Sequence, residues 1–77
     1  MNQERRKRLE IILEQLESIQ STAEEILDEE EHYRDNIPEN LQDSEDYNQS
    51  DAVCDDLSDA LDGLADTVSS IVSAIAE

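Results

Sequence analysis

Two segments in which apolar residues recur with a seven-residue period constrain the fold more than any other feature of this chain. The apolar positions of the first segment are Leu9, Ile12, Leu16, Ile19, Ala23, Ile26 and, after a break at Glu30, Tyr33. Those of the second segment are Cys54, Leu57, Leu61, Leu64, Val68, Ile71 and Ile75. Alternating steps of three and four residues are typical of helices that pack along a seam, at the a and d positions of a heptad. The sequence therefore predicts an all-α fold built from two helices.

The ends of the first helix are marked by a capping residue and a proline. Asn2 can cap the start, and no Gly or Pro interrupts the chain before Pro38. Pro38 disfavours helical geometry at Ile37 and favours a short turn over residues 38–42. We therefore expect the first helix over residues 3–34.

The second helix has two candidate starts. Ser50, followed by Asp51, is typical of a helix N-terminus, and Ser44 is an alternative start further upstream. We place the helix over residues 50–76, which leaves residues 35–49 as the connector. A glycine in the middle of this helix, at position 63, indicates either a close approach of another helix or simple tolerance.

The pairing of the two helices follows from their amphipathic faces. A connector of ordinary length favours an antiparallel, coiled-coil-like hairpin, and we expect residues 1–77 to form this one domain. Each apolar face is about four positions wide, which is more than one partner helix covers. With two Tyr, no Phe or Trp and one Cys, the chain has few large core side chains and no internal disulfide. We therefore predict that two hairpins dimerise into a four-helix bundle. The residues expected in its core and self-association surface are Leu9, Ile12, Leu16, Ile19, Ile26, Leu57, Leu61, Leu64, Val68, Ile71 and Ile75.

Acidic residues outnumber basic residues by 22 to five, and the formal net charge is −17. Arg34 is the only base outside a cluster at the start of the chain, which consists of Arg5, Arg6, Lys7 and Arg8. We expect no direct binding of nucleic acid by the acidic body, because phosphates would be repelled. A basic protein surface is the partner that this charge favours.

The acidic residues form rows along both helices. The row on the first helix is Glu10, Glu14, Glu17, Glu24, Asp28 and Glu31. The row on the second helix is Asp51, Asp55, Asp59, Asp62 and Asp66. A dimer, with twice the net charge of −17, would carry formally 34 negative charges over about 45 Å of helix, whereas duplex DNA carries about 26 over that length. Either the rows keep the bundle soluble, or they imitate DNA and occupy a basic site on another protein.

Few residues of the chain can carry chemistry. Glu29 and His32 have the spacing found in carboxylate-bridged metal bundles, but no second such pair exists, so we expect a solvated histidine at the helix end. Aspartates at positions 51, 55 and 56 would oppose a thiolate at Cys54, so we expect a buried core cysteine. Residues 43–51 lack the glycine and the final glutamate of a calcium loop. With no Gly-rich phosphate loop or nucleophile elbow, the chain is predicted not to be an enzyme and to use no metal and no cofactor.

The chain contains no run of about 20 apolar residues that could span a membrane. The basic residues 5–8 and the apolar residues after them resemble a signal peptide only briefly, because Glu10 and Glu14 interrupt the apolar region. One cysteine and no export signal predict a cytoplasmic protein without membrane association.

The connector and its flanks resemble a known group of proteins. Residues 29–44 read EEEHYRDNIPENLQDS, and with the flanking heptads they are similar to small acidic helical-hairpin proteins of Gram-positive bacteria and of their phages or integrative elements. The resemblance implies a helical hairpin and a mobile-element origin, and it carries over no functional residues.

These features predict a non-enzymatic acidic interaction or structural protein that acts as a homo-oligomeric helical bundle. The alternative is a DNA-mimic inhibitor that occupies a basic nucleic-acid-binding site on a partner protein. A third interpretation, a metal bundle with carboxylate ligands, has only the Glu29 and His32 pair in its favour.

Overall fold

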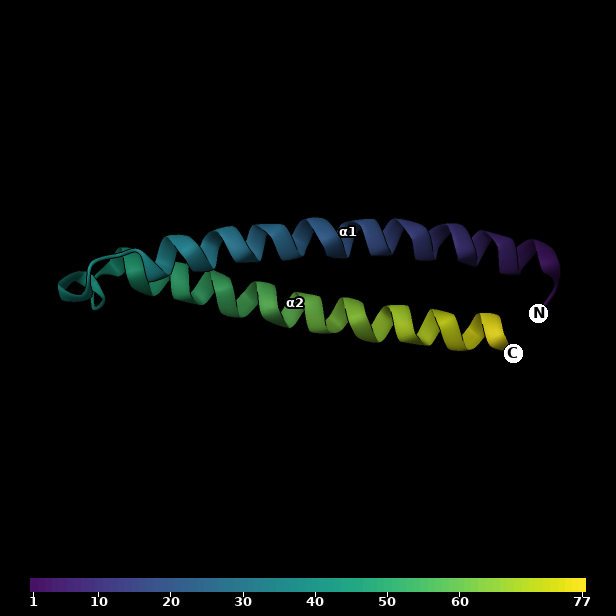
Figure 1. Ribbon diagram of the computed structural model, residues 1–77. Coiled ribbons are helices and arrows are strands. Elements are labelled where there is room, and N and C mark those ends of the chain that lie inside the picture. The colour runs from purple at the N-terminus through teal and green to yellow at the C-terminus, as the bar shows by residue number, and fades with distance from the viewer.

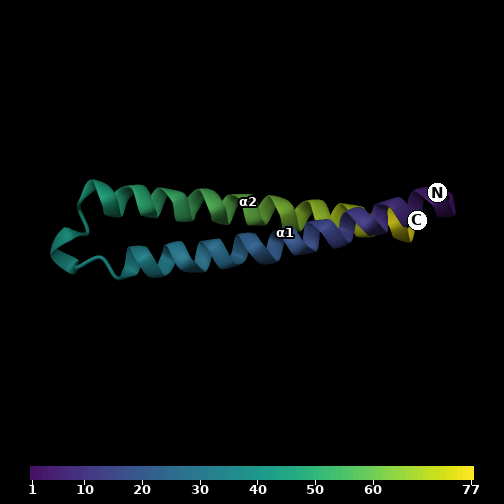
Figure 2. The ribbon, with the colours of Figure 1, turned by 90° about the horizontal axis from the view of Figure 1, so that it is seen from above.

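Two long helices lie side by side and run in opposite directions in the computed structural model, which describes all 77 residues (Figure 1). Helix α1 spans Gln3–Asp35 and helix α2 spans Glu45–Ala76, with a short 3-10 helix, η1, at Glu39–Leu41 between them. Both termini lie at one end of the hairpin and the connector lies at the other, as both views show (Figures 1 and 2). The prediction of an all-α two-helix hairpin is confirmed.

The first helix begins and ends close to its predicted bounds. The Asn2 side chain caps the start by accepting a hydrogen bond from the backbone N–H of Arg5 at 2.8 Å. At the other end the N–H of Asn36 donates to the carbonyl of His32 at 3.0 Å, and the helix stops before Pro38. A cap and a proline therefore fix α1 from the sequence alone.

The second helix begins earlier than the predicted start at residue 50. Ser44 is the N-cap, because its hydroxyl accepts a hydrogen bond from the N–H of Tyr47 at 3.3 Å. Glu45 and Asp46 occupy the first turn, where the positive end of the helix dipole stabilises carboxylates. Ser50 instead lies inside α2 and is buried against α1. The alternative start at Ser44 is thus the correct one.

Between the helices, α2 presents the predicted heptad. Its inward residues are buried at Cys54 and half-buried at Leu57, Leu61, Leu64, Val68, Ile71 and Ile75. The α1 residues that face them are half-buried and are Leu9, Leu13, Leu16, Gln20, Ala23, Leu27, Glu30 and Arg34. The seam between the helices is formed by these two sets.

The register predicted for α1 is therefore corrected at one of its two columns. Ile12, Ile19 and Ile26 were expected at d positions, but they lie outside the seam and are 42, 53 and 49% exposed. Leu13 and Leu27 take the inward places instead. The physical reason is that α1 is apolar over more columns than one partner helix can cover, so the hairpin must leave one column in solvent.

The hairpin has very little interior. Only Ser50 and Cys54 are buried, and the molecule measures 59 × 15 × 13 Å. Its radius of gyration is 17.5 Å, compared with about 11.5 Å for a compact domain of this length. The accessible surface is 5709 Å², whereas a folded monomer of this mass exposes about 4,700 Å². About 1,000 Å² of surface thus remains that a compact fold would have buried.

Candidate functional site

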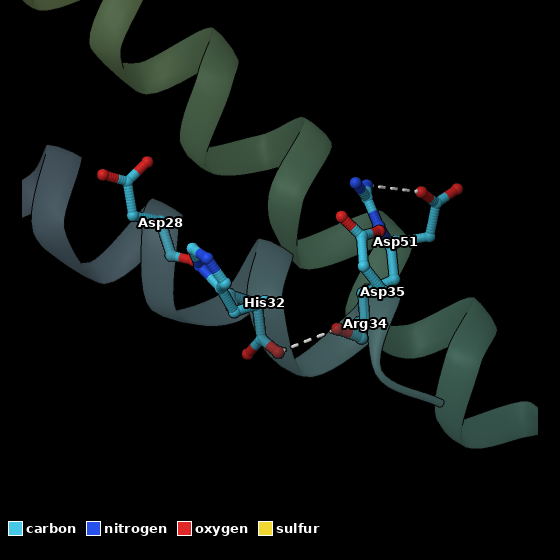
Figure 3. Close-up of polar contacts among 7 residues, drawn as sticks. Asp28, His32, Arg34, Asp35 and Asp51 are labelled. Atoms are coloured by element: carbon cyan, nitrogen blue, oxygen red, sulfur yellow. Dashed lines mark hydrogen bonds and ion pairs between the residues drawn. The ribbon is translucent and has the colours of Figure 1, made fainter. Parts of the chain in front are cut away.

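Arg34 joins the two helices near the connector. Its Nη1 donates to Oδ1 of Asp51 on α2 at 3.0 Å, and its Nε donates to Oδ1 of Asp35 at 3.0 Å (Figure 3). The hydrogen bond to Asp35 raises the pKa of the guanidinium, although burial opposes this shift. These are the only two ion pairs of the chain. The single base outside the N-terminal cluster therefore serves the contact between the helices.

Two further hydrogen bonds connect the helices at the same end. The Ser50 hydroxyl donates to Oε2 of Glu30 at 2.8 Å, and the Tyr33 phenol donates to Oδ2 of Asp46 at 2.5 Å. The hydrogen bond to Asp46, together with repulsion by its charge, raises the pKa of Tyr33. Polar contacts thus fix the alignment of the hairpin near the connector, and apolar packing continues it toward the termini.

Cys54 and His32, the two side chains considered for chemistry, differ in their exposure to solvent. Cys54 is 3% exposed, and burial raises the pKa of its thiol, while the nearby charge of Arg34 lowers it. The prediction of a buried core cysteine is confirmed. His32 is exposed, and its Nδ1–H donates to the carbonyl of Asp28 at 2.7 Å, as expected of a solvated helix-end histidine (Figure 3). No three His, Cys, Asp or Glu side chains converge in the way that a metal ion requires.

An apolar row runs along one side of the hairpin. It consists of Ile12, Ile19, Ile26 and Tyr33 on α1, which follow one another at seven-residue intervals, and we call it the isoleucine row. All four residues are about half exposed. Val53 of α2 lies on the same side, because it lines one shallow hollow together with Tyr33. A row of apolar side chains spaced one heptad apart therefore faces solvent along this edge of the hairpin.

Three shallow hollows lie along this row. Their α1 lining residues are Arg5, Arg8, Leu9 and Ile12 in the first, Ser18, Ile19, Thr22, Ala23 and Ile26 in the second, and Ile26, Glu29, Glu30 and Tyr33 in the third. Each set contains four residues with the spacing i, i+3, i+4, i+7. That spacing defines the hole into which a side chain of a neighbouring helix fits in a coiled coil. The surface of α1 thus offers vacant packing positions for another helix.

The acidic rows are solvated and almost without partners. Every member is exposed except Glu31 and Asp51, which are half-buried, and only Asp51 takes part in an ion pair. On α1 the row lies on the opposite side of the helix from the isoleucine row, since Glu10 and Glu14 are each two residues, or about 200° of rotation, from Ile12. The α2 row does not continue it, because Asp51 turns toward α1 to reach Arg34.

The N-terminal basic cluster, Arg5–Arg8, lies beside the C-terminus of α2 (Figures 1 and 2). The dipole of α1 disfavours cations at this place, whereas the negative end of α2 favours them. Arg6 takes a seam position, and its Nε is buried without a hydrogen-bond partner. An antiparallel hairpin implies this compensation, because it brings the start of α1 to the end of α2.

Neither α1 nor α2 has a stretch apolar enough, over sufficient length, to cross a membrane. Comparison with known proteins gives no match to a family model, to a curated protein or to a solved structure.

Proposed function

We propose that this protein is a non-enzymatic acidic interaction protein that acts as a homodimer, in which two hairpins pack into a four-helix bundle. The observation that carries the proposal is the isoleucine row, with Ile12, Ile19 and Ile26 each about half exposed at heptad spacing. A row with this period is typical of a surface that packs against a helix. Exposed apolar residues scattered singly need no explanation, but their recurrence at every seventh residue on one face supports an interaction surface.

The surface area of the hairpin supports the same proposal. It exposes about 1,000 Å² more than a compact monomer of its mass. A standard protein–protein interface removes about 800 Å² from each partner. The excess is thus enough for one interface of ordinary size. Dimerisation would also give a chain with only two buried residues the interior that it lacks.

Sedimentation equilibrium over a wide concentration range tests the dimer directly. We expect a mass of twice 8.7 kDa at high concentration, and a thermal midpoint that rises with concentration because dimerisation stabilises the folded state. A mass of 8.7 kDa at every concentration, with a midpoint independent of concentration, would refute the proposal.

The solvated acidic rows favour a second candidate, a DNA-mimic inhibitor. Of the 22 acidic residues, only Asp35 and Asp51 have a basic partner, so the α1 row stays free to meet a basic surface. The row lies away from the isoleucine row, and a dimer would therefore keep it accessible. For either role we propose a location in the cytoplasm. Basic nucleic-acid-binding proteins are found there, and a single cysteine stays reduced. We also propose that the protein originates from a mobile element.

Mimicry can be tested with a basic partner retained from the source cell at low salt. Duplex DNA should displace the protein from that partner, and salt should weaken the complex steeply. A variant with Glu10, Glu17 and Glu24 changed to Gln should no longer bind the basic partner. Its oligomeric mass in solution should equal that of the native protein. A complex that is insensitive to DNA, or that survives these changes, would remove this candidate.

A further inference from the structure

The isoleucine row is one half of a second heptad seam on α1. Its other column lies three residues further on in each heptad. Together the two columns are Arg5, Arg8, Ile12, Gln15, Ile19, Thr22, Ile26, Glu29 and Tyr33. All nine residues are exposed in the hairpin. A second helix can therefore pack here without disturbing the seam between α1 and α2.

The two ends of this second seam carry opposite charges. Arg5 and Arg8 line the hollow nearest the N-terminus. Glu29 and Glu30 line the hollow nearest the connector, and Asp46 lies close by, since it bonds Tyr33. The middle of the seam, around Ile19, is uncharged. A partner that fits this surface must be acidic where the seam is basic, basic where it is acidic, and apolar in between.

A second copy of α1, turned to run antiparallel, meets this requirement. Ile12 and Ile26 lie seven residues before and after Ile19. Arg8 lies eleven residues before Ile19, and Glu29 lies ten residues after it. A two-fold axis at Ile19 would therefore place Ile12 opposite Ile26 and Arg8 beside Glu29 and Glu30, while Arg5 comes opposite Tyr33. Such a self-complementary arrangement is the isologous interface of a two-fold dimer.

We propose that two copies dock through this seam in antiparallel orientation, with a two-fold axis at Ile19, and that Arg8 of each copy pairs with Glu29 of the other. The inference rests on the proposed dimer and specifies its geometry. The vacant hole lined by Ile26, Glu29, Glu30 and Tyr33 receives the Arg8 side chain. In a parallel dimer like charges would face one another, which adds to the repulsion between two chains that each carry −17.

Disulfide cross-linking distinguishes the orientations. Single cysteines are introduced at Ile12, Ile19 or Ile26 in a background with Cys54 changed to Ala. Because Ile19 lies on the proposed axis, Ile19→Cys should form a disulfide between copies. Ile12→Cys and Ile26→Cys should not cross-link alone, but the double variant with both cysteines should. Cross-linking of all three single variants would show a parallel dimer and overturn the inference.

A charge reversal tests the ion pair. Arg8→Glu should weaken the dimer by about tenfold or more, since two attractive pairs become repulsive. Glu29→Arg should weaken it in the same way, and the double variant should restore the affinity. Lys7→Glu is the matched control, because it makes the same change of charge one residue away, in the column of Glu14 on the opposite side of α1. Equal effects of Arg8→Glu and Lys7→Glu, or a failure of the double variant to recover, would overturn the pairing.

These results separate failure of the inference from failure of the proposed function. A monomeric mass for the native protein would remove both. A dimeric mass combined with the parallel pattern of cross-links, or with no rescue in the charge-reversed double variant, would leave the dimer intact and remove only its proposed geometry.

Discussion

The exposed side chain of Ile19 gives a direct measure of what the isoleucine row contributes to self-association. It is 53% exposed in the hairpin, so about half of its apolar area is available for burial in a dimer. Full burial of an isoleucine stabilises by about 1.5–3 kcal/mol, and the remaining half is therefore worth about 1 kcal/mol per copy. Two copies contribute about 2 kcal/mol to the dimer.

Ile19→Gln removes this contribution with little effect on α1 itself. Gln has a better helix propensity than Ile, and changes at exposed positions usually alter folding stability by less than about 0.5 kcal/mol. We expect the dissociation constant of the dimer to rise about 30-fold, since 1.4 kcal/mol corresponds to a factor of ten. Sedimentation equilibrium on a dilution series measures this change.

Ile11→Gln is the matched control for Ile19→Gln. Ile11 is 56% exposed and lies on the same helix, but it belongs to neither column of the second seam. Its replacement should leave the dissociation constant nearly unchanged. If both variants weaken the dimer equally, general hydrophobicity drives the association. If Ile19→Gln has no effect, the row does not lie in the interface and the reasoning from its exposure is wrong.

Three further perturbations address the hairpin. Gly63→Ala should raise the free energy of unfolding by about 1 kcal/mol, because an added Cβ meets no atom within 4 Å, and a lowered thermal midpoint would instead reveal a close contact with another chain. Arg34→Gln should lower the stability by about 1 kcal/mol, since Asp51 loses its ion pair and the half-buried stem loses packing, whereas unchanged denaturant unfolding would show the pair to be neutral. Alkaline conditions should destabilise the protein, because the raised pKa of Tyr33 means that the folded hairpin keeps a proton which the unfolded chain loses near pH ~10. This contribution is complete below that pH and is lost as the pH rises through the raised pKa. Helicity measured against pH should therefore fall less steeply in Tyr33→Phe than in the native protein, and identical curves would contradict the role of its bond to Asp46.

Local chemistry made much of this fold predictable. The heptads identify two helices, Asn2 caps the first, and Pro38 ends it. Local chemistry does not decide the start of α2, because Ser44 and Ser50 are both acceptable caps in the sequence. Ser44 prevails since two carboxylates follow it in the first turn and Ser50 can donate to Glu30 across the seam. That second contact joins residues of different helices, so no local signal reveals it.

Some features of the candidate site follow from the sequence, and others require the tertiary structure. The exposure of the acidic rows follows from their charge, and the burial of Cys54 follows from its heptad position. The exposure of the isoleucine row to solvent could not be deduced, because the apolar pattern allows either Ile12 or Leu13 to lie in the seam. The sequence does contain the spacing of the charged residues, since Arg8 lies four residues before Ile12 and Glu29 lies three residues after Ile26. That spacing gains a meaning only once these isoleucines are known to lie outside the hairpin seam.

By itself, the sequence determined that this chain forms two amphipathic helices with an acidic exterior and a connector at Pro38. Periodicity and capping are properties of a single helix, and they act before any partner is present. Only the tertiary structure decided which columns of α1 face α2. That choice depends on Leu13, Leu27 and Arg34 fitting against α2 better than the neighbouring column does, with Arg34 reaching Asp51. Since one helix can cover only part of an apolar face this wide, the same choice determined which residues remain for a second chain.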